Sequence, residues 1–367
     1  MEVSRAVLDR IDDPDLVGSA CLVDDSLVAR ERGQLERAIA SASRARDILA
    51  ANPDAPPDQL VDAMGALALA QSDSGQAAAA NASYVALEAT LRARDLTRTA
   101  TGAVALNNWA THLASSGQDA AALAIAERAA SLQRDLDPLR GAQQYTLRTM
   151  AFVLTSMGQW DRAGSLLDEA EKKARSHLDL MKVLTNRVRL YAESRDVEHL
   201  ALAVTDLEQA LRAAHLPPED PWHASVLLGR GWQALLRGSP GEALEYLDRS
   251  IGLARASPQW DLVMNRGILR RAEALTALGR FAEAERDARE VVEWADGQLG
   301  GFAHSFKSAQ AHRVLGQVME ARGDHEASLR EWRKAYDHYL DTVGPTAPAT
   351  RWVAARLGLP GPTAQTR

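Results

Sequence analysis

Few side chains in this sequence have the types and spacing that metal or acid–base chemistry needs. His304 and His312 are eight residues apart, with Glu320 eight further on, and could share one face of a helix. A metal ion needs its ligands close together, whereas these three are spread over too many helical turns, so we predict no metal site. His215 and His223 flank a proline-rich stretch and are expected in a loop.

The other side chains that could act as nucleophiles or acids also lack the neighbouring residues in sequence that catalysis would need. Because Cys21 is the single cysteine, a disulfide framework and a four-cysteine zinc site are excluded. No histidine lies near Cys21 in sequence, so we expect this thiol to have a structural role and not to act as a nucleophile. The pairs Asp12-Asp13 and Asp24-Asp25 are more typical of helix caps than of catalytic carboxylates. No phosphate-binding loop, H-E-x-x-H or G-x-S-x-G motif occurs. We predict a protein that is not an enzyme and uses no cofactor; a site assembled from distant segments is the alternative.

The net charge and the hydropathy of the chain indicate which classes of partner to expect. The 367 residues include 42 basic and 49 acidic side chains, for a net charge of −7. This balance argues against direct binding of nucleic acid, which favours a basic excess. No apolar run is long enough to span a bilayer and no signal peptide is visible, so we expect a cytoplasmic protein without a membrane partner. A homo-oligomer remains possible.

Regularly spaced glycines mark an internal repeat. Taking Gly158 as an origin, small residues follow five and twelve positions later, at Ala163 and Ala170. The same frame fits other glycines, and in one unit Glu198 takes the place of the glycine. The eight origins are residues 33, 75, 117, 158, 198, 238, 279 and 323, spaced 40 to 44 residues apart.

Each unit is predicted to form two helices. Apolar residues recur at helical spacing before each origin, as with Leu147, Met150 and Leu154. Small residues seven before and five after the origin let two antiparallel helices approach closely. The glycine ends the first helix by adopting a left-handed conformation. Because no strand pattern is found, the predicted fold class is all-α.

This pattern resembles the tetratricopeptide repeat (TPR) superfamily over roughly residues 18 to 340. The matching features are the small residue late in the first helix, the turn glycine, an aromatic residue two positions on (Trp160, Phe281) and the spaced small residues. The period near 41 residues is similar to the long-period TPRs of kinesin light chains and bacterial signalling proteins. The resemblance implies a right-handed α-solenoid of about eight helix-turn-helix repeats in one continuous stack. Asp25 and Tyr191 depart from the pattern, so units 1 and 5 are expected to be irregular.

The repeat also predicts the organisation of the chain. A leader segment over residues 1–17 includes a short helix at 2–11, and the solenoid follows over 18–343. The break at Gly344-Pro345 introduces a capping helix within 344–359. Residues 360–367 are expected to be disordered.

In the TPR superfamily the first helices of successive units line a concave groove, so the resemblance implies a binding surface one turn from the packing positions. The implied groove residues are Asn107, Thr111, Tyr145, Arg148, Phe152, Arg195, Trp232, Arg266, Glu273, Arg313 and Gln317. Aromatic rings offer stacking surface and arginines bind carboxylates, a combination suited to gripping a peptide. Asn107 could clamp a peptide backbone as donor and acceptor. Taken singly, such residues are more often solvated or part of the core.

These features predict a non-catalytic scaffold or adaptor that binds a protein or peptide in its groove. The alternative is a regulatory or sensor region of a bacterial signalling protein, as an extension of a Ser/Thr kinase or a transcription regulator. Binding of chaperone C-termini is not expected, because the asparagine of unit 3 has no matching lysine.

Overall fold

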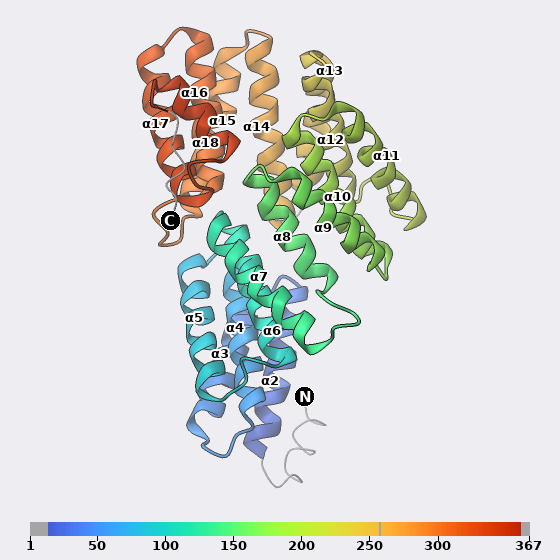
Figure 1. Ribbon diagram of the computed structural model, residues 1–367, viewed down its shortest axis with the longest axis vertical. Coiled ribbons are helices and arrows are strands. Elements are labelled where there is room, and N and C mark those ends of the chain that lie inside the picture. The colour runs from blue at the N-terminus through green and yellow to red at the C-terminus, as the bar shows by residue number, and fades with distance from the viewer. Residues whose placement is uncertain (1–13, 257, 361–367) are drawn as a thin grey trace. The chain divides into compact units, whose positions relative to one another are not determined.

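The computed structural model describes residues 14–256 and 258–360 (Figure 1). The leader helix expected over 2–11 and the tail expected beyond Pro360 fall outside these residues. The described part forms 17 α-helices and one 3₁₀ helix, Pro258–Trp260, without a strand. The prediction of an all-α solenoid of TPR-like repeats is confirmed. No helix in this part combines the length and apolar character that crossing a bilayer requires.

The helices alternate as eight pairs followed by a short last helix. The first helices of the pairs are α2 (Pro14–Glu31), α4 (Pro57–Asp73), α6 (Ala100–Ser115), α8 (Gln144–Ser156), α10 (His177–Ser194), α12 (Trp222–Leu236), α14 (Asp261–Ala277) and α16 (Phe306–Arg322). The second helices are α3 (Leu35–Ala51), α5 (Ala77–Ala93), α7 (Asp119–Leu136), α9 (Trp160–Lys172), α11 (Val197–Ala213), α13 (Pro240–Ala254), α15 (Phe281–Gly297) and α17 (His325–Thr342). The last helix, α18 (Pro348–Arg356), lies where the capping helix was predicted.

The turn between the two helices of a pair adopts the left-handed conformation in seven units as predicted. The φ angles lie between 72° and 89° at Gly33, Gly75, Gly117, Gly158, Gly238, Gly279 and Gly323. Unit 5 differs from the expected frame. Arg195, with φ 61°, ends α10, and α11 begins at Val197. The origin assigned to Glu198 is therefore wrong by three residues, because an arginine rather than a glycine adopts the left-handed turn.

Close approach of the paired helices depends on small residues, as the repeat implied. A Cβ added at Gly231 of α12 would come within 2.7 Å of the Leu247 side chain on α13. A Cβ at Gly316 of α16 would collide with the Trp332 indole of α17. Larger side chains at these positions would force the helices apart.

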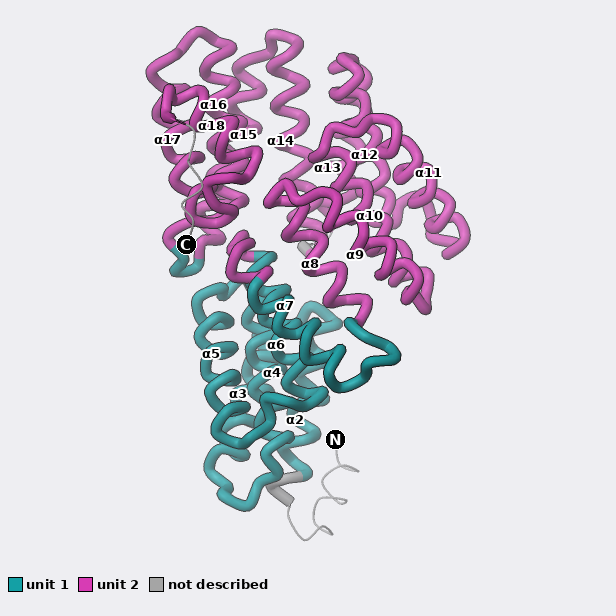
Figure 2. The backbone as a smooth tube through the Cα atoms, in the orientation of Figure 1, with its two compact units in different colours: residues 1–115, 124–142, 300–302 teal, residues 116–123, 143–299, 303–367 magenta. Residues whose placement is uncertain are grey.

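The chain divides into two compact units, shown in teal and magenta in Figure 2, where a single solenoid was expected. Unit 1 comprises residues 1–115, 124–142 and 300–302, and unit 2 comprises residues 116–123, 143–299 and 303–367. The connection after α7 includes Pro138 and Gly141, which end the helix. Each unit is described by itself.

Unit 1 has a small aromatic core. The rings of Tyr84 and Trp109 stack with centroids 6.5 Å apart, and Tyr84 is 2% exposed. The Trp109 indole N–H donates to Asn81 at 3.0 Å, and the Ser72 hydroxyl lies 2.8 Å from His112. These contacts join α4, α5 and α6.

Unit 2 closes on itself through contacts between segments far apart in sequence. The Phe306 amide donates to the Gly117 carbonyl at 2.9 Å, and the Ser305 hydroxyl donates to the Ser116 carbonyl at 3.0 Å. A Cβ added at Gly158, in the turn between α8 and α9, would collide with Pro348 at the start of α18. The turn after α8 is thus in contact with the start of α18.

Candidate functional site

Unit 2 contains a cavity of about 450 Å³ that is partly open to solvent. Its walls come from the first helices α8, α10, α12, α14 and α16, with α9, α17 and α18 completing them. This volume lies within the roughly 300–1,000 Å³ range of sites for small ligands. The cavity is therefore large enough for a few amino-acid residues and too small for a folded partner.

Aromatic rings form much of the wall. They are Trp160, Trp232, Phe306, Tyr339 and Trp352. The guanidinium of Arg270 lies 4.7 Å from the centroid of the Trp232 ring, and that of Arg356 lies 3.5 Å from the Trp352 ring. Such rings offer flat apolar surface to a ligand side chain.

Polar groups on α14 and α16 form a network in the cavity. Arg313 donates to Gln317 at 2.9 Å and to Glu273 at 3.3 Å. Arg270 also pairs with Glu273, at 2.8 Å, so this one carboxylate is shared by two arginines. Each guanidinium therefore keeps hydrogen-bond donors that Glu273 does not occupy.

A buried ionic cluster adjoins the cavity. Arg189, 5% exposed, donates to the Phe152 carbonyl at 2.8 Å and to the Ser156 hydroxyl at 2.5 Å. The buried carboxyl of Asp119, in the first turn of α7, adjoins these groups, and neither of its oxygens has a hydrogen-bond partner among the described residues. Burial raises the pKa of Asp119 to about 6, against the opposing effect of Arg189.

Two further cations belong to this cluster. The guanidiniums of Arg189 and Arg266 lie 4.0 Å and 5.2 Å from the centroid of the Phe152 ring. Burial lowers the pKa of Arg266 to about 9, and the charge of Arg189 adds to the effect. Burial also lowers the pKa of Lys307 to about 8, with Arg266 as the next cause. Placing these cations together in a poorly solvated site costs stability.

The cavity and the adjoining cluster carry an excess of positive charge in a chain whose net charge is −7. The cationic side chains are Arg189, Arg195, Arg266, Arg270, Lys307 and Arg313, and the anionic ones are Asp119, Glu193, Asp261 and Glu273. Six cations against four anions favour an anionic ligand.

The predicted groove residues fall into four groups. Five of them line the cavity: Arg195, Trp232, Glu273, Arg313 and Gln317. Phe152 and Arg266 belong to the adjoining cluster, and Tyr145 and Arg148 lie elsewhere on α8. Asn107 and Thr111 lie on α6 in unit 1, where Asn107 is 6% exposed.

Several residues in or beside the cavity were not among the predicted groove residues, for different reasons. With Arg195 as the turn, Arg189 is six residues before it, the position that Phe152 and Trp232 occupy in their own units. Because the origin of this unit was placed at Glu198, Arg189 was not counted among the predicted groove residues. Tyr339 lies on α17 and Trp352 on α18, whereas the predicted groove was formed by the first helices of the units alone.

Arg195 is both a cavity residue and a strained turn residue, so replacing it with glycine should have two opposite effects. Left-handed backbone costs a non-glycine residue about 1–2 kcal/mol, which glycine avoids. We expect Arg195→Gly to raise the free energy of unfolding by about 1 kcal/mol in urea denaturation. It should also weaken binding of an anionic ligand.

The control for Arg195→Gly is Arg237→Gly. Arg237 also ends a first helix but has φ −84°, so glycine brings no relief there. Its replacement should be neutral or destabilising. A loss of stability in Arg195→Gly would contradict a strained turn at this position.

No family model matches this chain, and no curated protein matches it. Solved structures with a similar fold include the apo form of the quorum sensor NprR from B. thuringiensis, with a TM-score of 0.60 and 12% identity, covering 92% of this chain and 91% of that one. A Rap protein complexed with competence and sporulation factor gives a TM-score of 0.55 at 9% identity, covering 94% and 97%.

The APC/C hetero-tetramer Cut9–Hcn1 gives a TM-score of 0.51 at 13% identity; the match covers 96% of this chain and 57% of that one. At such identities the likeness concerns the fold alone. An α-solenoid fold agrees with the eight helix pairs of this chain and with the left-handed glycines in their turns. The fold of this chain is the α-solenoid of tetratricopeptide-repeat proteins.

Proposed function

We propose that this chain is a non-catalytic interaction protein whose unit 2 binds a short, carboxylate-bearing peptide segment in its cavity. The observation that carries the proposal is the positive charge excess of an aromatic-walled cavity of about 450 Å³ taken together with its adjoining cluster. The carboxylate belongs to an acidic side chain or to the free C-terminus of the peptide.

The lining groups suit the parts of a peptide. Arg195 and Arg313 are the cationic groups for the carboxylate, since guanidinium and carboxylate form paired hydrogen bonds. Gln310 and Gln317 offer amides that match the donor and acceptor of a peptide backbone. The indole rings of Trp232 and the other aromatic residues would cover an apolar side chain.

A second candidate function is ligand sensing within a bacterial signalling protein. The similar structures include a quorum sensor and a Rap protein complexed with a factor. In this chain α18 supplies part of the cavity wall, through Pro348, Ala349 and Trp352. A ligand that fills the cavity would therefore change the contacts of α18, which a regulatory domain could detect.

The test uses pools of hexapeptides that end either in a free C-terminal carboxylate or in a C-terminal amide. Each form is prepared as one pool of acidic composition and one pool of basic composition. Affinity selection followed by mass spectrometry identifies what the purified chain retains. We expect acidic or free-carboxylate peptides to be enriched and basic amidated peptides to be absent. Selected peptides are then titrated by fluorescence anisotropy.

The matched variants are Arg313→Gln and Arg330→Gln. Removing Arg313 leaves Glu273 paired with Arg270, so the fold should survive, while Arg330 lies exposed on α17 outside the cavity. A hydrogen bond to a charged group contributes about 1.5–3 kcal/mol, so Arg313→Gln should weaken binding about tenfold or more. Equal affinity for both variants, or selection of basic peptides, would contradict the proposal.

A further inference from the structure

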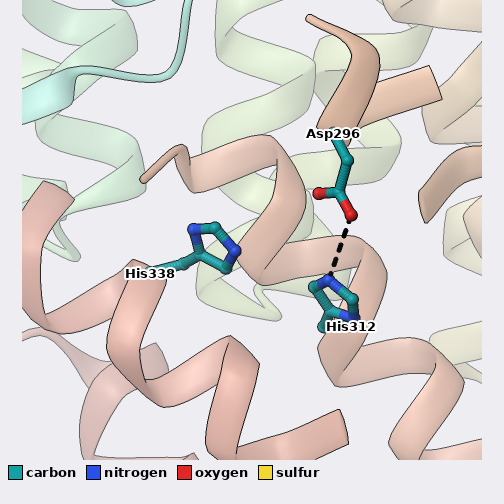
Figure 3. A group of neighbouring side chains, drawn as sticks. All are labelled: Asp296, His312 and His338. Carbon is teal, nitrogen blue, oxygen red and sulfur yellow. Dashed lines mark ion pairs between the residues drawn. The ribbon is translucent and has the colours of Figure 1, made fainter. Parts of the chain in front are cut away.

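We propose that Asp296, His312 and His338 form a binding site for a divalent transition-metal ion, with zinc as the expected ion. Asp296 ends α15, His312 lies in the middle of α16, and His338 lies on α17. One ligand atom from each lies within 4.8 Å of the others. Figure 3 shows the three side chains converging from neighbouring helices.

His312 is held in the orientation that a metal ligand needs. Its ring is 3% exposed, and its Nδ1 lies 2.6 Å from the Glu331 carboxylate. Because a carboxylate accepts the Nδ1 proton, the Nε2 lone pair remains for another partner, and Nε2 lies 3.5 Å from Asp296. A carboxylate that holds the far nitrogen of a histidine is the usual support of histidine–metal bonds.

His338 must change its tautomer to bind an ion through Nε2, because its Nδ1 accepts a hydrogen bond from the Ser305 amide. Its Nδ1 lies 3.2 Å from the Ser305 amide and 3.3 Å from His304 Nδ1. In Figure 3 one ring nitrogen of His338 is turned towards Asp296 and His312. Binding an ion at Nε2 requires the proton to sit on Nδ1 and be donated to His304. The Ser305 amide then loses its acceptor, and this exchange lowers the affinity.

The donor set selects the kind of ion. Two imidazole nitrogens and one carboxylate oxygen suit zinc and its neighbours, whereas calcium and magnesium prefer oxygen alone. Zinc binds such atoms at about 2.0–2.2 Å, so the ligands must draw together by about 1–1.5 Å from their present separations. Asp296, whose side chain is 41% exposed at a helix end, can make most of this movement. Water would fill the remaining positions.

This site lies outside the proposed peptide cavity, whose lining includes none of the three ligands. The ion would join α15, α16 and α17, the last three helices of the repeat region. Sequence spacing did not predict it, because the ligands are 16 and 26 residues apart and lie on separate helices.

The experiment measures zinc binding to the full chain after removal of metals with a chelator. Because Cys21 is exposed and could bind zinc itself, every protein carries Cys21→Ser. Zinc is titrated by calorimetry, and cobalt serves as a spectroscopic probe of nitrogen and oxygen ligands. We expect one zinc ion per chain and a higher melting temperature with zinc.

The ligand variants are Asp296→Asn and His338→Gln, and their matched controls are Glu293→Gln on α15 and His325→Gln on α17, both exposed. Circular dichroism confirms that each variant is folded. The ligand variants should bind zinc at least about tenfold more weakly, and Glu331→Gln about 10- to 100-fold more weakly. The controls should bind as the parent does. Absence of zinc binding in the Cys21→Ser parent, or equal binding by ligand variants and controls, would overturn the proposal.

Discussion

Replacing Gly158 with alanine is expected to lower the free energy of unfolding of the protein by about 2–5 kcal/mol. Two costs combine. Gly158 has φ +74°, where a residue with a Cβ is strained by about 1–2 kcal/mol. The added methyl group would also collide with Pro348, and such overpacking costs about 1–3 kcal/mol. Urea denaturation followed by circular dichroism measures the change.

Gly238→Ala is the matched control for Gly158→Ala. Gly238 lies in the turn after α12 with φ +76°, and an added Cβ there would meet no atom within 4 Å. This variant therefore carries the backbone strain alone, so the difference between the two reports the contact with α18. Equal losses in both would show that α18 does not rest on the turn between α8 and α9.

Asp119→Asn is expected to stabilise the protein at pH 8 and to have little effect at pH 4. Burial raises the pKa of Asp119 from 3.8 to about 6, so the folded chain binds this proton more tightly than the unfolded chain. The stability that this group contributes is complete below pH 4 and is lost as the pH rises through about 6. Asparagine never bears the charge. Because one pKa unit corresponds to about 1.4 kcal/mol, the gain at pH 8 is at most about 3 kcal/mol.

Urea denaturation of both proteins at pH 4, 6 and 8 measures the difference directly. Asp135→Asn serves as the control, since Asp135 is an exposed carboxylate on the same helix, and should change stability by less than about 0.5 kcal/mol. A difference between wild type and Asp119→Asn that stays constant over this pH range would contradict a raised pKa.

The repeat was predictable because its signals are local. A glycine in the left-handed conformation and small residues at fixed distances from it are set by backbone sterics within one helix pair. The same rule failed at Arg195, because nothing in an arginine's type signals a left-handed backbone. The frame was then displaced by three residues in that unit. Arg195 was assigned to a helix face, whereas it ends the helix, and Arg189 was missed.

The candidate site was only partly predictable, because its remaining parts depend on contacts between distant segments. Trp352 reaches the cavity because α18 packs beside the turn at Gly158, a contact between residues almost two hundred positions apart. Burial of Asp119 depends on the segment before α7 bonding to Ser305 and Phe306. Helical periodicity gives the face of each helix and carries no information on such pairings.

The contact between the turn after α8 and the start of α18 bears on how unit 2 melts. In an open array of repeats each unit touches only its neighbours, so the ends fray first and unfolding spreads inward. In unit 2 the turn at Gly158 and the start of α18 cover each other, so neither end is free to fray alone. We infer that helices α8 to α18 lose their structure in one cooperative step, with amide protons near both ends exchanging as slowly as those in the middle.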